Sequence, residues 1–587
     1  MRIERHQVSG AAVSAAREDF TNRVGRQVHS MAKAGRMDTY AWRSISEEFL
    51  DYLGAVSVGT PGLDTPEAEA ALKDACEAAA GAVAYAAYHP HCTFDVFLAY
   101  VNFGMSYEPG DGAPEESVTP GEWIDALCLS VLRDRAKWHG EAFHFARRKF
   151  AGRTEGIPVG ELATGLTAVV LDDTGDEGSA YPPSAQAKLA AVDAALGRIR
   201  TRAEETGEPL LDGPDGVALQ ALRALAAEDR DAFDAALAGL LTRHAALHGS
   251  TTSPRSLLPL VPIALAALAY RTLGWAPAVS SDYLPHALVT GFESSRGPRV
   301  AGFGRNRRPD AVAALAAGPL VVERPACERE GIQRIEVMYE ERLHEAFTAV
   351  DGKPLAVGQL AGLLADQQRL FQWRAGNPGD LADAQLATLR LASQMGAALF
   401  RIALAEPDTE VEVSIGGRTL RYPAKRGREA GAGYWQMATA FALTTGVRED
   451  LAPLVLTGPA FAGADGSAFT AYRQALHAYL KGADPEAAAR RALEEAEKAK
   501  DWGIALPPAV LLSQLVEGDE ESFNLALADA LEAHRAYHQV ADRADGPDVS
   551  IDLDVLALTC HARRRGWAIR VESPYLPQYL LRTAEPF

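Results

Sequence analysis

The chain carries one motif twice, and this repeat limits how it can fold. WAPAVSSDYLPHAL begins at Trp275, and WAIRVESPYLPQYL begins at Trp567, 292 residues later. Upstream, DRDAFDAALAGLLTRHAALH from Asp229 matches DEESFNLALADALEAHRAYH from Asp519, with nine of 20 positions identical and an offset of 290 residues. Loops tolerate such small changes in length. Landmarks that recur in one order at a nearly constant offset predict two copies of one domain.

Two earlier landmarks fit the same order, since Trp123 faces Trp435 and Gly81 faces Gly396. We therefore expect a first domain at 1–290 and a second at 331–587. Between them, SSRGPRVAGFGRNRR holds five arginines and no acidic residue: Arg296, Arg299, Arg305, Arg307 and Arg308. Its glycines and charges predict an exposed, arginine-rich linker at 291–330.

The composition favours helices. Alanine, the strongest helix former, is abundant, and aromatic residues make up 7% of the chain. Strand patterns are few: Val411, Val413 and Ile415 alternate before Gly416 and Gly417, as in a hairpin, and residues 92–109 offer a similar pattern in the first copy. The predicted fold is mainly α, with two tandem homologous helical domains that each carry a small β-hairpin.

The net charge of −20 argues against a nucleic-acid partner, because such proteins need a basic surface to replace condensed counterions. An acidic surface would instead steer a basic protein toward the chain. Solubility alone is an equally good explanation of the charge.

Five cysteines without a CxxC pair, none at matched positions in the two copies, are typical of a reducing compartment. The first ten residues show no signal peptide. The longest apolar run, Leu257–Tyr270, contains two prolines and is too short to cross a bilayer, so it predicts a buried helix. We expect a cytoplasmic protein without a membrane partner.

No catalytic or cofactor-binding motif was found, so we expect no enzyme activity and no cofactor. The best candidates for chemistry are His244 with His248 and His534 with His538, each pair four residues apart on a predicted helix. Such spacing can place two metal ligands on one face. The same face is apolar and no third ligand repeats, so structural histidines are the favoured interpretation, with metal binding as the alternative.

The opening motif predicts a structural clasp. A residue before proline is pushed toward extended backbone, so Pro285 and Pro577 should each follow an extended arm and start a short helix. The arm would be held by aromatic and apolar side chains that dock on the preceding helix. The aromatic members are Trp275, Tyr283, Trp567 and Tyr575.

The second copy reads Phe-x-x-Ala-Leu-Ala from Phe523, then His534, Gly566-Trp567 and finally Glu-Ser-Pro-Tyr-Leu-Pro from Glu572. This pattern resembles the immunity protein 49 family. The first copy keeps most of the pattern but has Ser280 in place of the glutamate. Both halves resemble the family, whose members occur in actinobacteria and usually have one copy.

The resemblance implies a helical protein of a bacterial polymorphic toxin system that neutralises a cognate toxin by stoichiometric binding. A basic toxin is expected because charge complementarity speeds capture. The alternative is a helical scaffold with two docking domains and no toxin, and a metal-dependent hydrolase built on the histidines is a weaker third. The sequence indicates neither the toxin's activity, nor the binding surface, nor the oligomeric state.

Overall fold

The computed structural model describes residues 1–584 except 36, 111–114, 176–180, 250–251, 294–296, 326–331, 349–355, 377–381, 426 and 459–465. It divides into two compact units, Met1–Arg296 and Gly297–Phe587. The division falls inside the segment for which we predicted a linker. Each unit is described by itself below.

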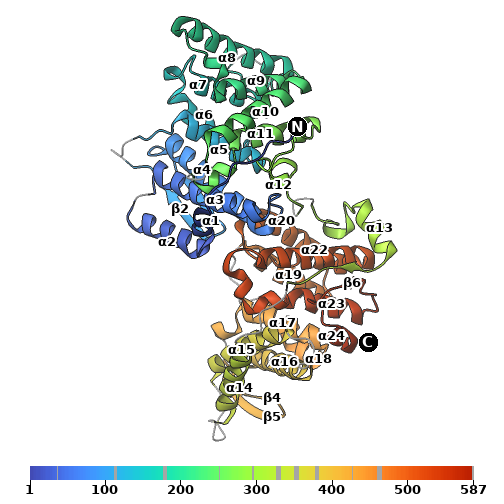
Figure 1. Cartoon of the computed structure of the whole chain (residues 1–587). Coiled ribbons are helices and arrows are strands. Elements are labelled where there is room, and N and C mark those ends of the chain that lie inside the picture. Colours follow the sequence, from blue (N-terminus) through green and yellow to red (C-terminus); the bar gives the residue numbers. More distant parts are fainter. Residues whose placement is uncertain are drawn as a thin grey trace. The chain divides into compact units, whose positions relative to one another are not determined.

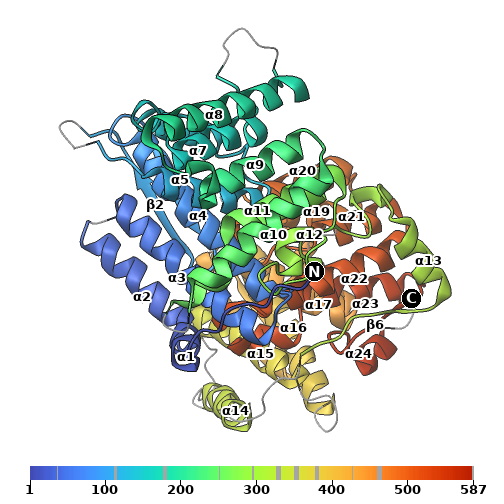
Figure 2. The same ribbon diagram turned by 45° about the horizontal axis from the view of Figure 1, so that its top comes forward.

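Helices predominate in the described part of both units, as Figures 1 and 2 show, which confirms the mainly α fold class. The first unit contains α1 (Gly10–Arg17), α2 (Phe20–Lys33), α3 (Thr39–Gly59), α4 (Pro66–Tyr88), β1 (Phe94–Leu98), β2 (Phe103–Tyr107), α5 (Pro120–Leu132), α6 (Gly140–Arg148), α7 (Pro158–Val170), α8 (Ala185–Thr206), α9 (Pro214–Ala226), α10 (Arg230–Leu247), α11 (Leu260–Leu273) and α12 (His286–Thr290).

The second unit repeats this order after an added helix. It contains α13 (Pro309–Ala317), β3 (Leu320–Val321), α14 (Ile332–Thr348), α15 (Val357–Ala375), α16 (Ala382–Leu404), β4 (Glu410–Ile415), β5 (Arg418–Pro423), α17 (Ala432–Thr445), α18 (Arg448–Thr457), α19 (Ala468–Leu480), α20 (Glu486–Ala499), α21 (Ala509–Glu517), α22 (Glu520–His538), α23 (Leu553–Arg564), β6 (Val571–Glu572) and α24 (Gln578–Thr583).

Local sequence explains where the helices begin. Thr65 caps α4 by accepting a hydrogen bond from the Ala68 backbone, and Pro66 occupies the first turn, where its missing N–H costs nothing. Neighbouring helices then pack side by side: α3 lies on α4, and α7, α8 and α9 lie against one another (Figure 2). The predicted hairpins are both present as antiparallel pairs, β1 with β2 and β4 with β5.

Matched tryptophans show that the two units pack alike. Trp123 on α5 and Trp435 on α17 are fully buried. Each indole N–H donates to a backbone carbonyl of the following helix, Phe143 in one unit and Leu454 in the other, at 2.9 Å in both. A buried indole needs such a partner. The shared contact supports the alignment of these residues in the two copies.

The apolar run is a core helix in the structure. Among the described residues, Pro254–Leu273 alone is long and apolar enough to cross a membrane, and 56% of its apolar window is buried inside the first unit. Its main part is α11, where Ile263, Leu265 and Ala267 are at most 1% exposed.

Each unit joins its first residues to a segment near its end by parallel pairing. In the second unit β3 pairs with β6 in parallel, and in the first an isolated parallel bridge joins Arg2 to Ser280. The sequence repeats here too, because Ile3-Glu4-Arg5 corresponds to Val322-Glu323-Arg324. The second copy therefore starts before residue 331, where we placed its first residue.

Arg5 and Arg324, which occupy matched positions, form hydrogen bonds beside these paired segments. Arg5 donates to the Ser57 hydroxyl at 2.8 Å and to the Asp282 carbonyl at 3.3 Å. Arg324 donates to the carbonyls of Ala375 and Ser550, at 3.0 and 2.8 Å. Each guanidinium therefore links the ends of its own unit.

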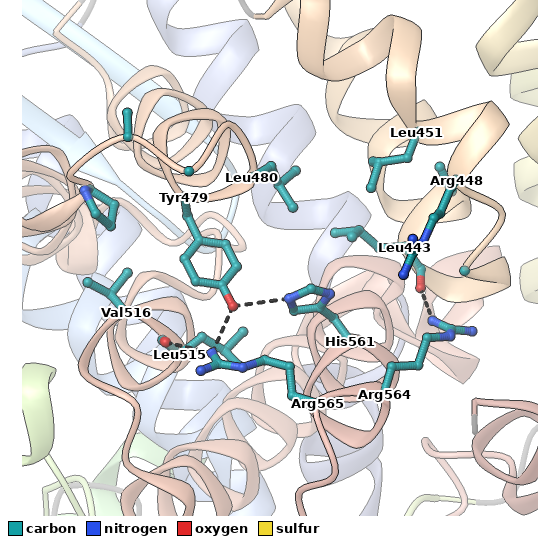
Figure 3. A pocket seen from close by; sticks show the side chains of 15 residues that line it. Leu443, Arg448, Leu451, Tyr479, Leu480, Leu515, Val516, His561, Arg564 and Arg565 are labelled. Atoms are coloured by element: carbon teal, nitrogen blue, oxygen red, sulfur yellow. Dashed lines mark hydrogen bonds between the residues drawn. The ribbon is translucent and has the colours of Figure 1, made fainter. Parts of the chain in front are cut away.

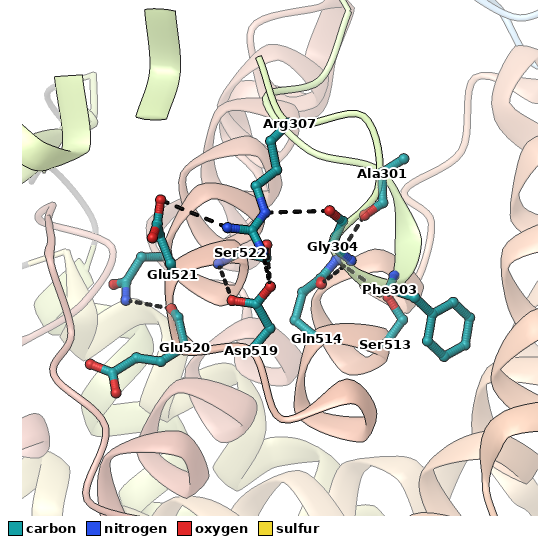
Figure 4. Close-up of polar contacts among 11 residues, drawn as sticks. Ala301, Phe303, Gly304, Arg307, Ser513, Gln514, Asp519, Glu520, Glu521 and Ser522 are labelled. Carbon is teal, nitrogen blue, oxygen red and sulfur yellow. Dashed lines mark hydrogen bonds and ion pairs between the residues drawn. The ribbon is translucent and has the colours of Figure 1, made fainter. Parts of the chain in front are cut away.

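The arginine-rich segment packs on the second unit, as Figure 4 shows. The Phe303 backbone donates to the Ser513 hydroxyl at 3.1 Å, and the Gly304 backbone donates to the Gln514 side chain at 2.7 Å. Arg307 forms an ion pair with Asp519 at the start of α22. Acidic and polar groups of the same unit thus hold the loop.

Arg299 makes the strongest of these contacts. Its guanidinium lies 2.7 Å from the Asp529 carboxylate and 2.6 Å from that of Glu532, both on α22. Val300 is fully buried in the core of the second unit. Residues 297–322 therefore pack on the second unit instead of forming a free linker, because α22 presents carboxylates that pair with the arginines, while Arg305 and Arg307 stay exposed as predicted.

Candidate functional site

The repeated histidines and tyrosines form one cluster in each unit. The ring of His244 lies edge-on to that of Tyr283, with centroids 5.2 Å apart, and His534 meets Tyr575 in the same way at 5.1 Å. Both tyrosines are at most 1% exposed. The extended arm therefore docks on α10 and α22, whereas we had expected the helix directly before it. The short helices α12 and α24 follow Pro285 and Pro577 as predicted.

In the first unit the cluster also includes His6 from the N-terminal strand. The Tyr283 hydroxyl accepts a hydrogen bond from the His6 backbone N–H at 3.0 Å and lies 2.5 Å from His6 Nδ1. The His6 and His248 rings stack with centroids 5.4 Å apart. Burial, with the neighbouring charges of His244, His248 and Arg5, lowers the pKa of His6 to about 4. His6 is therefore neutral at pH 7, and its contacts tie the start of the unit to its end.

The second unit buries its pair more completely. His534 is 9% exposed and His538 is 4% exposed. His538 Nδ1 lies 3.1 Å from the Arg543 carbonyl. Burial lowers the pKa of His534 against the opposing charge of Asp552. These side chains fill the space under the loop between α22 and α23.

In the first unit, a backbone carbonyl occupies one ring nitrogen of each histidine. His244 Nε2 lies 2.7 Å from the Ser256 carbonyl and His248 Nδ1 lies 2.9 Å from the His244 carbonyl. A carbonyl only accepts, so these two nitrogens carry hydrogens, and only His244 Nδ1 and His248 Nε2 could bind a metal. In the described part of the chain, no three His, Cys, Asp or Glu side chains are placed to hold a metal ion.

The two tryptophans of the motif are less buried than its two tyrosines. Trp275 and Trp567 are only partly buried. Each packs on the matched phenylalanine, Phe233 at 6.1 Å and Phe523 at 5.5 Å between ring centroids. The buried aromatic ring at the centre of the clasp is therefore the tyrosine.

His244 and His248 also line a cavity of about 560 Å³ in the first unit. The lining also includes three carboxylates, Glu47 on α3, Asp125 on α5 and Asp215 on α9, together with Arg243 and Arg255. The volume is typical of ligand sites, which are concave and hold a few convergent polar groups. The second unit has no matching set, since Met437 occupies the position of Asp125 at the same offset as Trp435.

Asp125 and Asp215 differ from Glu47 in having no ion pair among the described residues. Glu47 pairs with Arg255 at 2.7 Å. Asp125 is exposed, and the protein around it, followed by Glu47 and Asp215, raises its pKa to about 6 against the charge of Arg255. The cavity thus offers a negative charge that a cation would stabilise.

Sequence reasoning missed Asp125 and His6. Asp125 lies in an ordinary helical stretch, EWIDALCLSVL, and nothing in that pattern marks it. His6 follows Ile3-Glu4-Arg5, whose match at Val322-Glu323-Arg324 was a detectable signal. Three residues are too few to stand out before the strand pairing is known.

Comparison with known proteins agrees with the repeat. The profile of the family described as immunity protein 49 matches residues 60–288 and 378–580. No curated protein and no solved structure matches the chain. The two matched regions lie one in each unit and include most of the helices of both. The chain therefore belongs to the immunity protein 49 family and carries two copies of its domain.

Proposed function

We propose that this protein neutralises a cognate bacterial toxin by binding it, without enzymatic turnover. The observation that carries the proposal is the family match in both units. Immunity to a toxin requires a protein partner, and the net charge of −20 favours a basic one. We place this action in the cytoplasm of the producing cell.

The cavity of the first unit supports the proposal with a specific contact. Asp125 lies beside Glu47 and Asp215, and its raised pKa reflects repulsion and loss of water. A lysine or arginine of the toxin would relieve that repulsion on binding. An ion pair formed in a concave, partly dehydrated site is stronger than one on an open surface. The same cavity is half apolar, which suits the stem of such a side chain.

The proposal predicts a neighbouring gene for a secreted protein with a toxic C-terminal domain, and that domain is the partner to test. Co-expression should restore growth, and the purified toxin domain should lose activity in a titration that saturates at one or two toxins per chain. One equivalent would indicate that a single unit binds, and two that both do. Inactivation at far lower ratios would indicate turnover and contradict the proposal. Failure to protect, with the chain folded, would favour the scaffold alternative.

A further inference from the structure

The second unit holds a cavity of about 590 Å³ whose charge is opposite to that of the first unit's cavity (Figure 3). It is bordered by the end of α17, the starts of α18 and α20, and the ends of α19, α21 and α23. Arg448, Arg564 and Arg565 line it, and no carboxylate is among its described lining residues. Three arginines in a lining whose described members include no acidic residue stand out in a chain of net charge −20.

Arg564 is the deepest of these charges. Its side chain is buried, and its two terminal nitrogens donate to the carbonyls of Leu443 and Thr444, the latter at 2.7 Å. These carbonyls end α17, where the helix dipole favours a cation. A side chain at Gly446 would collide with the guanidinium, and the φ of 74° there also suits glycine. Burial lowers the pKa of Arg564, so carbonyl dipoles offset its charge only in part.

Arg565 and His561 are held in a chain of hydrogen bonds through Tyr479. Arg565 donates to the Tyr479 hydroxyl at 2.8 Å and to the Leu515 carbonyl at 2.9 Å. The same hydroxyl lies 3.0 Å from His561 Nε2. Burial and the two arginines lower the pKa of His561 to about 4, so the ring is neutral at pH 7. Figure 3 shows Tyr479, His561 and Arg565 converging, with Arg448 and Arg564 together at the other end of the view.

The rest of the lining is apolar and includes Leu451, Leu480 and Val516. Fixed guanidinium donors match carboxylate and phosphate oxygens, and an apolar wall accepts a hydrocarbon or ring. We propose that this cavity binds a small organic anion, a carboxylate or phosphate monoester attached to an apolar body. This lies beyond toxin binding and does not depend on it.

The first unit lacks the necessary residues at the corresponding positions. At the offset of 292 residues, Ala269 takes the place of His561 and Leu273 the place of Arg565. The arginine that donates to the end of α5 is Arg271, through the carbonyls of Val131 and Leu132. Both copies therefore have an arginine that donates to the end of the matched helix, α5 or α17. The further arginine Arg565 and the contact between Tyr479 and His561 occur only in the second copy. The anion site is expected in that unit alone.

The test is calorimetric titration of the full chain with phenyl phosphate, compared with inorganic phosphate, phenol and benzylamine. Phenyl phosphate should bind saturably with one site per chain, more tightly than phosphate or phenol, and benzylamine should not bind. Arg448→Gln, a change at an exposed residue, should weaken binding at least tenfold. Arg565→Gln should do the same. Arg491→Gln, an exposed arginine of α20, removes the same charge outside the lining and should leave affinity unchanged.

Absence of saturable binding would overturn the proposal, as would equal binding by the wild type and both lining variants. An equal loss in Arg491→Gln would mean that general charge, not the cavity, attracts the anion. Because no toxin is present, none of these outcomes bears on the immunity function. Far-ultraviolet circular dichroism of each variant identifies any loss that comes from unfolding.

Discussion

The imidazole of His534 stands perpendicular to the ring of Tyr575, at 89° with 5.1 Å between centroids. Tyr575 comes from the arm after α23 and His534 from α22, so the contact closes the end of the second unit. The first unit repeats it with His244 and Tyr283 at 90°. The same geometry in two diverged copies indicates that packing, rather than chemistry, maintains these residues.

We expect Tyr575→Ala to destabilise the second unit by about 3–5 kcal/mol, the range for removing a fully buried aromatic ring. Trp567→Ala should cost clearly less, because its ring is only partly buried. Urea unfolding followed by hydrogen exchange of α22 and α24 measures both. An equal or larger effect of the tryptophan change would contradict the assignment of the tyrosine as the centre of the clasp.

Arg299→Ala should release the arginine-rich loop from α22. It removes ion pairs at 2.6 and 2.7 Å and leaves Asp529, whose pKa burial raises, without its cation. Hydrogen bonds to charged groups contribute about 1.5–3 kcal/mol each. The fraction of molecules whose loop is detached from α22 should therefore rise roughly tenfold or more. Trypsin should then cut at Arg305 and Arg307 correspondingly faster.

The matched control is Arg308→Ala, since Arg308 pairs with Asp310 two residues away on the surface. Surface pairs contribute little, so cleavage should hardly change. Rapid cleavage of the wild type at Arg305 or Arg307 would argue that the loop is an open linker after all.

His561 should make the second unit less stable in acid. Its folded pKa of about 4 lies below the ordinary histidine value of 6.5, so the unfolded chain binds the proton more tightly. The stability is present above pH 6.5 and is lost as the pH falls toward 4, by up to about 3 kcal/mol at about 1.4 kcal/mol per pKa unit.

Asp554 has the opposite effect on stability in acid. Burial raises its pKa to about 7, so the folded state gains stability as this carboxyl takes up a proton. The measurement is therefore a difference: unfolding free energies of the wild type and of His561→Ala, which carries the first copy's residue, at pH 7 and pH 4.5. From pH 7 to pH 4.5, the free energy of unfolding should fall less for His561→Ala than for the wild type. The exposed His29→Ala should follow the wild type.

The repeat made most of the fold predictable. Aligned landmarks at offsets of 290 and 292 residues predicted two helical units, and alternation before Gly416 and Gly417 predicted a hairpin. The arginine-rich segment was misjudged because its partners, Asp529 and Glu532, lie about 230 residues later in the chain. Local composition carries no information on such contacts.

The candidate sites were less predictable than the fold. Helical spacing identified the histidine pairs, but only tertiary structure shows that both meet the clasp tyrosines. The cavity residues Glu47, Asp125 and Asp215 come from three separate helices. Each is unremarkable in its own segment, so their convergence depends on the packing of α3, α5 and α9.

Asp125→Asn should both stabilise the first unit and weaken toxin binding. The folded pKa of Asp125, about 6, lies above the ordinary aspartate value of 3.8, so its ionised form is disfavoured in the folded state. At pH 7 to 8 the neutral amide avoids repulsion from Glu47 and Asp215, and the midpoint of thermal unfolding should rise. Below pH 4 that gain should vanish, because the carboxyl is then protonated in both states.

The same substitution should slow association with a basic toxin, and Asp125→Lys should slow it further, by at least tenfold at low salt. The difference should shrink as salt rises, since charges are screened over about 8 Å at physiological ionic strength. Glu205→Lys, an equal charge change on an exposed residue near the end of α8, is the control and should have a much smaller effect. Stopped-flow association rates at several salt concentrations measure this. Unchanged rates in both Asp125 variants would exclude the cavity as the place where the toxin's basic residue binds, while titration of inhibition would still test immunity itself.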